Sequence, residues 1–217
     1  MAIKGSALGE LAEQLRSADF DLSSRWEPVE TWFATWAQRP GLRTDLRTHL
    51  LELPNEQADT VIKRSRETTT HFAWCLRDQP GEPFTFWLHE YKEQRDWRAG
   101  YADSVHNHRY HFCTTILRGG YTHERYTAEV APETELIRST ELVTATRCPV
   151  GASNTLLASD FHRIPQAVDG TMTFLVKSRE VTPWSLSYDP MTHESHRHVP
   201  VESRLSQLAK RLEAVDG

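Results

Sequence analysis

The chain has 217 residues, a formal charge of −5 at pH 7 and 38% hydrophobic residues. This length fits one domain, and an acidic balance without a basic stripe argues against a nucleic-acid partner. No apolar run approaches the ~20 residues that span a bilayer, so we expect no membrane partner. The N-terminus lacks an apolar signal stretch, and three cysteines are few and odd in number. We expect a cytoplasmic monomer or homodimer.

The first part of the chain, residues 1–68, is predicted to be helical and to pack on the rest of the domain. Apolar residues recur there at helical spacing, and Pro28 suits an opening turn. The expected helices are one with Leu8, Leu11 and Leu15 on one face, one with Val29, Trp32, Phe33 and Trp36, and two over about residues 42–51 and 56–66.

Residues 69–190 are predicted to form a β-barrel. They contain seven or eight short runs rich in Thr, Val and aromatic residues, separated by turn signals such as Gly119-Gly120 and Asp169-Gly170. Such spacing is typical of an antiparallel barrel or sandwich. Residues 191–217 are expected to form a loop and a final amphipathic helix that carries Val201, Leu205, Leu208 and Leu212.

The segment SVHNHRYHFC brings three histidines and a cysteine together. Residues two apart in a strand point to the same face, so His106 and His108 would project together. A third histidine, His162, follows 54 residues after His108, a separation that lets several barrel strands return it to the first pair. Histidine is the commonest metal ligand, and we predict that these three hold one divalent metal.

These residues resemble the cupin superfamily. Gly100, His106, His108 and Gly120 match the glycines and His-x-His of the first cupin motif, and Gly151 and His162 match parts of the second. The second motif's usual proline, second glycine and asparagine are missing. The resemblance covers roughly residues 70–188 and implies a mainly β fold, a cupin-type antiparallel barrel (jelly roll), with helical segments at both ends.

Cys113 occupies the place of the motif's glutamate, which is similar to the cysteine dioxygenase branch. That resemblance implies Fe(II) held by three histidines, with open positions for substrate and O₂. In animal members the cysteine is crosslinked to a tyrosine. Two departures separate this chain from the branch. The substrate-binding arginine expected at residues 72–77 appears only as the displaced Arg77, and Lys177 lies near the tyrosine's place.

Other residues have open interpretations. His89 and Tyr91 share a strand face, and His89 is either a general base or a packed histidine. Lys177 lies either at an open strand end or against an anionic substrate. Cys113 either flanks the site or fills the core. His111 is a ligand, a pocket residue or a structural residue, and Asp160 is an imidazole partner or a turn residue. His193, His196 and His198 suggest a second metal site, but a solvated loop is the favoured interpretation.

The sequence therefore predicts a non-haem Fe(II) oxygenase that acts with O₂ on a small anionic molecule, amino-acid-like or thiol-bearing by resemblance. One alternative is a lyase, isomerase or hydrolase that uses Zn, Ni or Mn as a Lewis acid. Another is a metal-dependent sensor or binding protein without turnover. The candidate catalytic residues are His89, Tyr91, Cys113 and Lys177, and the candidate metal ligands are His106, His108 and His162.

Overall fold

The structure, a computed structural model, describes residues 6–200 apart from 19, 21 and 23–25, and beyond them only Arg204, Leu208, Lys210 and Arg211. Among these residues no helix is both long and apolar enough to cross a membrane. The predicted C-terminal helix lies outside the described residues, apart from those isolated positions.

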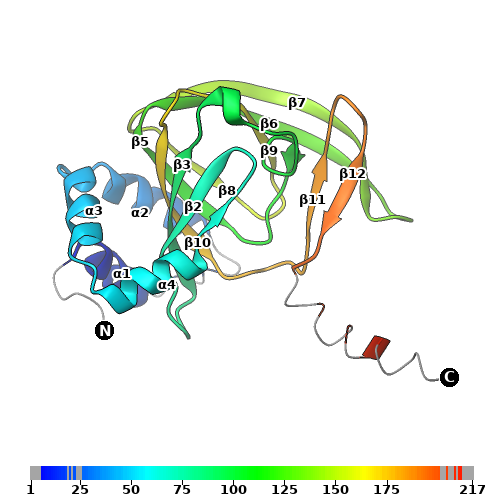
Figure 1. Cartoon of the computed structure of the whole chain (residues 1–217). Helices are drawn as coiled ribbons and strands as arrows, with labels where there is room; N and C mark the ends of the chain where they lie inside the picture. The colour runs from blue at the N-terminus through cyan, green and yellow to red at the C-terminus, as the bar shows by residue number, and fades with distance from the viewer. Residues whose placement is uncertain are drawn as a thin grey trace.

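Four helices precede the barrel, as predicted: α1 (Ala7–Ser17), α2 (Glu27–Ala37), α3 (Leu42–Leu51) and α4 (Asn55–Arg64) (Figure 1). The Ser6 side chain caps α1 by accepting the Gly9 N–H, and Pro28 lies in the first turn of α2. The helices gather on one side of the molecule, against the strands that follow (Figure 1).

Twelve strands among the described residues form two antiparallel sheets of six. The first sheet, in spatial order, contains β1 (Arg66–Glu67), β2 (His71–Arg77), β3 (Phe84–Tyr91), β10 (Met172–Ser178), β5 (Phe112–Arg118) and β8 (Ser153–Leu156). The second contains β12 (Ser195–His198), β11 (Ser185–Tyr188), β4 (Val105–His106), β9 (Phe161–Ala167), β6 (Gly120–Ala131) and β7 (Leu136–Pro149). A 3₁₀ turn (Gln94–Asp96) follows β3. The mainly β fold of two antiparallel sheets, with a helical N-terminal segment, confirms the predicted fold class.

The largest apolar core lies between the helices and the outer face of the first sheet. Phe33 of α2 stacks on Phe174 of β10 at 6.3 Å between ring centroids, and Phe86 of β3 joins them. Because side chains alternate along a strand, the neighbours of these residues point to the opposite face. Leu175 accordingly lines the barrel interior, and its cross-strand partner Trp87 packs in the same cluster. With an apolar core outside the barrel, the interior is free to hold a polar cavity.

A glycine pair carries the chain from the first sheet to the second, between β5 and β6. Gly119 has φ of +75°, and a Cβ there would lie 2.3 Å from the Thr171 Oγ1 and 2.9 Å from its backbone Cα. Only glycine fits this conformation and this close approach. The Thr171 hydroxyl accepts the Gly120 N–H at 3.0 Å, which secures the crossing.

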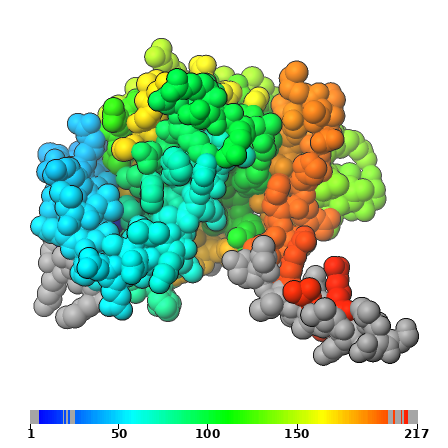
Figure 2. All heavy atoms as spheres, in the orientation of Figure 1, coloured from blue at the N-terminus to red at the C-terminus, as the bar shows by residue number. Residues whose placement is uncertain are grey.

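The segment that contains His193, His196 and His198 differs from the expected loop. Residues 195–198 form β12, which pairs antiparallel with β11 and extends the second sheet. The β11–β12 hairpin, drawn in orange, lies across the barrel from the helices (Figure 2). The prediction of a solvated loop was therefore wrong for these four residues, because backbone pairing to β11 outweighs their polar composition.

A candidate three-histidine metal centre

His106, His108 and His162 lie together inside the barrel. His106 of β4 and His162 of β9 are direct cross-strand partners, and His108 follows two residues after His106. One ring nitrogen from each of the three falls within 4.8 Å of the others. The Nε2 atoms of His108 and His162 are 2.9 Å apart. Antiparallel pairing of two strands distant in sequence thus produces the cluster that the spacing predicted.

The ring nitrogens are oriented to offer lone pairs to one ion. The Nδ1 of His106 donates to the Ser104 carbonyl oxygen at 2.9 Å, because a carbonyl can only accept. The Nε2 of His106 therefore keeps its lone pair. Burial lowers the pKa of His106 to about 4 and lowers the pKa values of His108 and His162 well below the ordinary range. All three imidazoles are neutral at pH 7, the state in which histidine binds metal.

His123 of β6 is a member of the cluster that the sequence reasoning missed. Its Nε2 lies 3.1 Å from the Nδ1 of His162. If the His162 Nε2 offers its lone pair to a metal, the Nδ1 of His162 carries the proton and donates it to His123. A ligating histidine is commonly fixed in this way by an acceptor on its other nitrogen. The sequence signal for His123 was its spacing two residues after Tyr121. Polar residues occur on both faces of β6, so the pattern does not show which face is inside.

The cluster fits a transition metal. Three neutral imidazoles suit Fe, Zn, Ni or Cu, whereas Mg²⁺ and Ca²⁺ require carboxylate or carbonyl oxygens. None of the described residues that line the surrounding cavity is Asp or Glu. The donor set is therefore a three-histidine group able to hold a metal, and its chemistry leaves the identity of that metal open.

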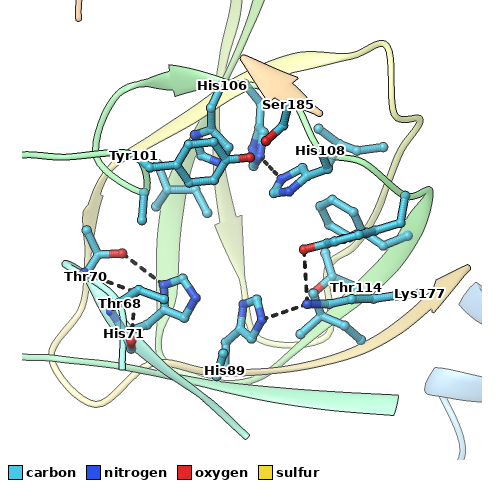
Figure 3. A pocket seen from close by; sticks show the side chains of 18 of the residues that line it. Thr68, Thr70, His71, His89, Tyr101, His106, His108, Thr114, Lys177 and Ser185 are labelled. Carbon is cyan, nitrogen blue, oxygen red and sulfur yellow. Dashed lines mark hydrogen bonds between the residues drawn. The ribbon is translucent and has the colours of Figure 1, made fainter. Parts of the chain in front are cut away.

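The histidines form one wall of a cavity of about 420 Å³. This is the size of a small-molecule site. The lining includes seven histidines, four tyrosines and three basic residues among the described residues: His71, His89, His106, His108, His123, His162, His198, Tyr91, Tyr101, Tyr110, Tyr121, Arg66, Arg109 and Lys177. Figure 3 shows His106 and His108 at one end of the cavity and His71, His89 and Lys177 at the other.

His89, Tyr91 and Lys177 line the cavity. His89 of β3 stacks on His71 at 4.3 Å between centroids, and burial lowers the pKa of His89 well below the usual range. Tyr91 is buried, which raises the pKa of its phenol. Lys177 is only 3% exposed and reaches the Tyr110 hydroxyl at 3.3 Å and the His89 Nε2 at 3.5 Å. Of the two interpretations of Lys177, the open strand end is excluded.

Cys113 lies on the other face of β5, which corrects the expectation that it flanks the site. Its neighbours Phe112 and Thr114 line the cavity, whereas Cys113 belongs to the apolar core shared with the helices. Its Sγ lies 3.4 Å from the Thr155 hydroxyl, and burial raises the thiol's pKa to about 12. The thiol is a small buried hydrophobe, and a catalytic role for it has no geometric support.

His111 also points away from the cavity lining. Its Nδ1 accepts the Ala158 N–H at 2.9 Å, and its ring lies 5.8 Å from that of Trp26. Asp160 accepts the Leu157 N–H in a turn, so it takes the turn role. These contacts favour the structural interpretations of His111 and Asp160.

The basic residues near the site are not those the resemblance suggested. Arg77 donates two hydrogen bonds to the Glu82 carboxylate and does not line the cavity. Arg66 and Arg109 line it instead, and Arg109 is paired with Glu180 at 2.7 Å. His198, expected in a solvated loop, lines the cavity instead, and its Nε2 lies 2.7 Å from the Ser187 hydroxyl.

Comparison with known proteins gives only distant structural similarities. No family model matches the chain, and no curated protein matches it. Hydroxypropylphosphonic acid epoxidase from S. wedmorenis is 12% identical, with 54% of this chain and 56% of that chain covered and a TM-score of 0.35. The DMSP lyase DddQ from Ruegeria pomeroyi DSS-3 is 15% identical, with 57% and 56% covered and a TM-score of 0.33.

A third structure, an RmlC-like cupin protein from Desulfovibrio desulfuricans, is 15% identical, with 50% of this chain and 82% of that chain covered and a TM-score of 0.31. The chain thus spans about half the length of the epoxidase and of the lyase. At these TM-scores the similarities support no assignment of activity.

Proposed function

We propose that the protein is a non-haem Fe(II)-dependent oxygenase of the cupin type that acts with O₂ on a small anionic substrate. The observation that carries the proposal is the convergence of three neutral imidazoles in a cavity that also holds Lys177. Iron held by neutral ligands keeps its full positive charge, and it supplies one-electron redox chemistry and positions for an anionic group. The three-histidine set is also the feature shared with the cysteine dioxygenase branch.

The chain's own residues would position the substrate and manage its protons. Burial acts to raise the pKa of Tyr110, but the Lys177 and Arg66 cations outweigh it and lower that pKa below the usual value. The phenol is thereby a better proton donor than a free tyrosine. Neutral His89, 3.5 Å from the Lys177 Nζ, is an acceptor on the same side of the cavity. Tyr91 closes the wall behind them and keeps its proton.

The Tyr110–Lys177 pair also favours a second candidate function. A phenol and an ammonium 3.3 Å apart provide proton transfer without any oxidant, which a metal-dependent lyase, isomerase or hydrolase requires. A sensor or binding protein without turnover needs no such groups, so the cavity gives that alternative less support. The two enzymatic candidates differ in whether O₂ is consumed.

The test is oxygen uptake by the full chain after anaerobic reconstitution with Fe(II). The panel contains cysteine, 3-mercaptopropionate, non-thiol amino acids and small dicarboxylic acids. We expect O₂ uptake coupled to loss of one anionic substrate. Turnover of a panel acid with no O₂ uptake would support the second candidate, and no turnover of any acid with any of Fe, Zn, Ni or Mn would contradict both.

Within that panel we expect cysteine to be a poor substrate. An arginine that grips a carboxylate through two nitrogens recovers the hydration lost on entry, but Arg77 is committed to Glu82 outside the cavity. Lys177 offers a point charge from another direction. A misplacement of about 1 Å can cost on the order of a hundredfold in rate. Fast, tightly coupled conversion of cysteine to its sulfinate would refute this expectation.

A further inference from the structure

Lys177 places its side-chain amine inside the barrel without a carboxylate beside it, and burial lowers the pKa of that amine. Its Nζ lies 4.4 Å from the centroid of Trp87 and 4.9 Å from that of Tyr110, so it rests against two aromatic faces. Its polar contacts are the Tyr110 hydroxyl and the His89 Nε2. Among the described lining residues there is no Asp or Glu to pair with it.

A second cation lies close by. The Arg66 guanidinium is 5.5 Å from the Trp87 centroid, so the same indole contacts both Lys177 and Arg66. Arg109, the third basic residue of the lining, is already paired with Glu180. Arg66 lies on exposed β1 whereas Lys177 is buried, and neither has an acidic partner among the described residues of the lining.

The arrangement is unfavourable for the protein alone. Burying a charged group without a counter-ion is costly, and contact with an aromatic face returns only part of that cost. An apolar residue at position 177 would avoid that cost. The neighbouring Val176 packs in the apolar core on the other face of β10. An anion that entered with the substrate would neutralise the charge and gain strong hydrogen bonds.

Lys177 and the three-histidine group face one shared space. The phenol ring of Tyr110 contacts both, at 5.2 Å from the His108 ring and at 4.9 Å from the Lys177 Nζ. In Figure 3 the Lys177 side chain extends into the cavity toward His89, on the side opposite His106. One aromatic ring thus separates the two positions, a gap that a molecule of a few carbon atoms can bridge.

We propose that Lys177, with Arg66 beside the same indole, is a second anion-binding subsite, and that the substrate is a small molecule with two anionic groups. One group would bind at the three-histidine metal and the other at Lys177. This inference rests on the proposed function for the metal end only. The class includes short dicarboxylates and acids that carry a carboxylate together with a phosphonate or a sulfonate.

The test is calorimetric titration of the full chain at pH 7, with Fe(II) bound anaerobically and after metal removal. The probes are malonate, succinate and glutarate, each compared with the monocarboxylate of equal carbon number (propionate, butyrate and valerate). The variants are Lys177→Met, which keeps the side-chain length without the charge, and Lys63→Met on exposed α4 as the charge-matched control.

We expect at least one dicarboxylate to bind the iron-loaded protein tenfold or more tightly than its monocarboxylate. Lys177→Met should lower the affinity for that dicarboxylate by about 10- to 100-fold. It should leave monocarboxylate affinity, iron content and the circular dichroism spectrum unchanged. Lys63→Met should change none of them. If Lys177→Met does not fold, Lys177→Gln and the comparison of acids on the wild type replace it.

Equal affinity for dicarboxylates and monocarboxylates, or equal dicarboxylate affinity with and without the Lys177 charge, would overturn the proposal. The metal-free titration separates this failure from a failure of the proposed function. If the chain binds no metal but still binds a dicarboxylate in a Lys177-dependent way, the subsite proposal stands and the oxygenase proposal fails. If the chain binds iron but its dicarboxylate affinity does not depend on Lys177, only the subsite proposal fails.

Discussion

At the scale of single residues, His123 has the clearest untested role. Its Nε2 lies 3.1 Å from the Nδ1 of His162, and with the His162 Nε2 on a metal it would accept the Nδ1 proton and so fix the orientation of that ring. Replacement by leucine, which cannot accept a hydrogen bond, should weaken metal affinity about 10- to 100-fold. His123→Gln should preserve most of the affinity, because its amide oxygen reaches the position of the imidazole Nε2. Metal titrations of the two variants check this, and equal affinities would contradict it.

Cys113 leads to a second prediction at this scale. Its Sγ points into the helix-side core, away from the cavity that the tyrosines of the lining share. A thioether crosslink to one of those tyrosines would need the thiol on the other face of β5. We therefore expect an intact mass with no loss of two hydrogens and a single band on gels. A crosslinked peptide in a tryptic digest would disprove this.

The same residue shows how far sequence reasoning reached. Alternation within β5 places Cys113 on the face opposite Phe112 and Thr114, which line the cavity. The expectation that it flanks the site came from the family resemblance instead. His106, His108 and His162 were predictable because alternation and strand count both brought them together. His123 was not, because a strand with polar residues on both faces does not reveal which face is inside.

At the scale of elements, the helices and the first sheet depend on each other. Phe33 of α2 is 1% exposed and contacts Phe174, which is fully buried. Phe33→Ala should lower the free energy of unfolding by about 3–5 kcal/mol, because it leaves a cavity in this core. Ile62→Ala on α4 removes an exposed side chain and should cost little. Urea unfolding of both variants is the measurement, and equal losses would contradict the assignment of the core.

Element boundaries followed the sequence well where periodicity was strong. Residues 42–51 form α3 as predicted, and α4 spans Asn55–Arg64 where a helix over about residues 56–66 was predicted. β12 was missed because Ser195–His198 contain no apolar residue. Its pairing depends on β4 and β11, where Ser187 is the partner of His106. A strand recruited by such tertiary contacts has no local signal to read.

At the scale of the whole molecule, the number of buried neutral histidines predicts acid sensitivity. Burial lowers the pKa of His71 to about 3 and that of His106 to about 4, against about 6.5 in the unfolded chain. Between those values the unfolded state binds protons that the folded state does not, so stability falls as pH falls below 6.5. Each such histidine contributes about 1.4 kcal/mol per pH unit within its window.

Urea unfolding of the metal-free chain from pH 8 to pH 5 measures this dependence. We expect stability to be nearly level above pH 7 and to fall steeply below 6.5. His71→Gln, which cannot be protonated, should make the fall shallower. Constant stability down to pH 5 would contradict the buried, neutral state of the cluster.

The central claim is that one iron is held by His106, His108 and His162. Elemental analysis after anaerobic Fe(II) loading and desalting tests it most directly, on the wild type and on alanine variants at each of the three positions. Cys113→Ala, on the opposite strand face, is the matched control. The account predicts about one iron per chain in the wild type and the control, and loss of most of it in each histidine variant, because two imidazoles cannot satisfy the ion. Full iron occupancy in all three histidine variants would contradict the claim.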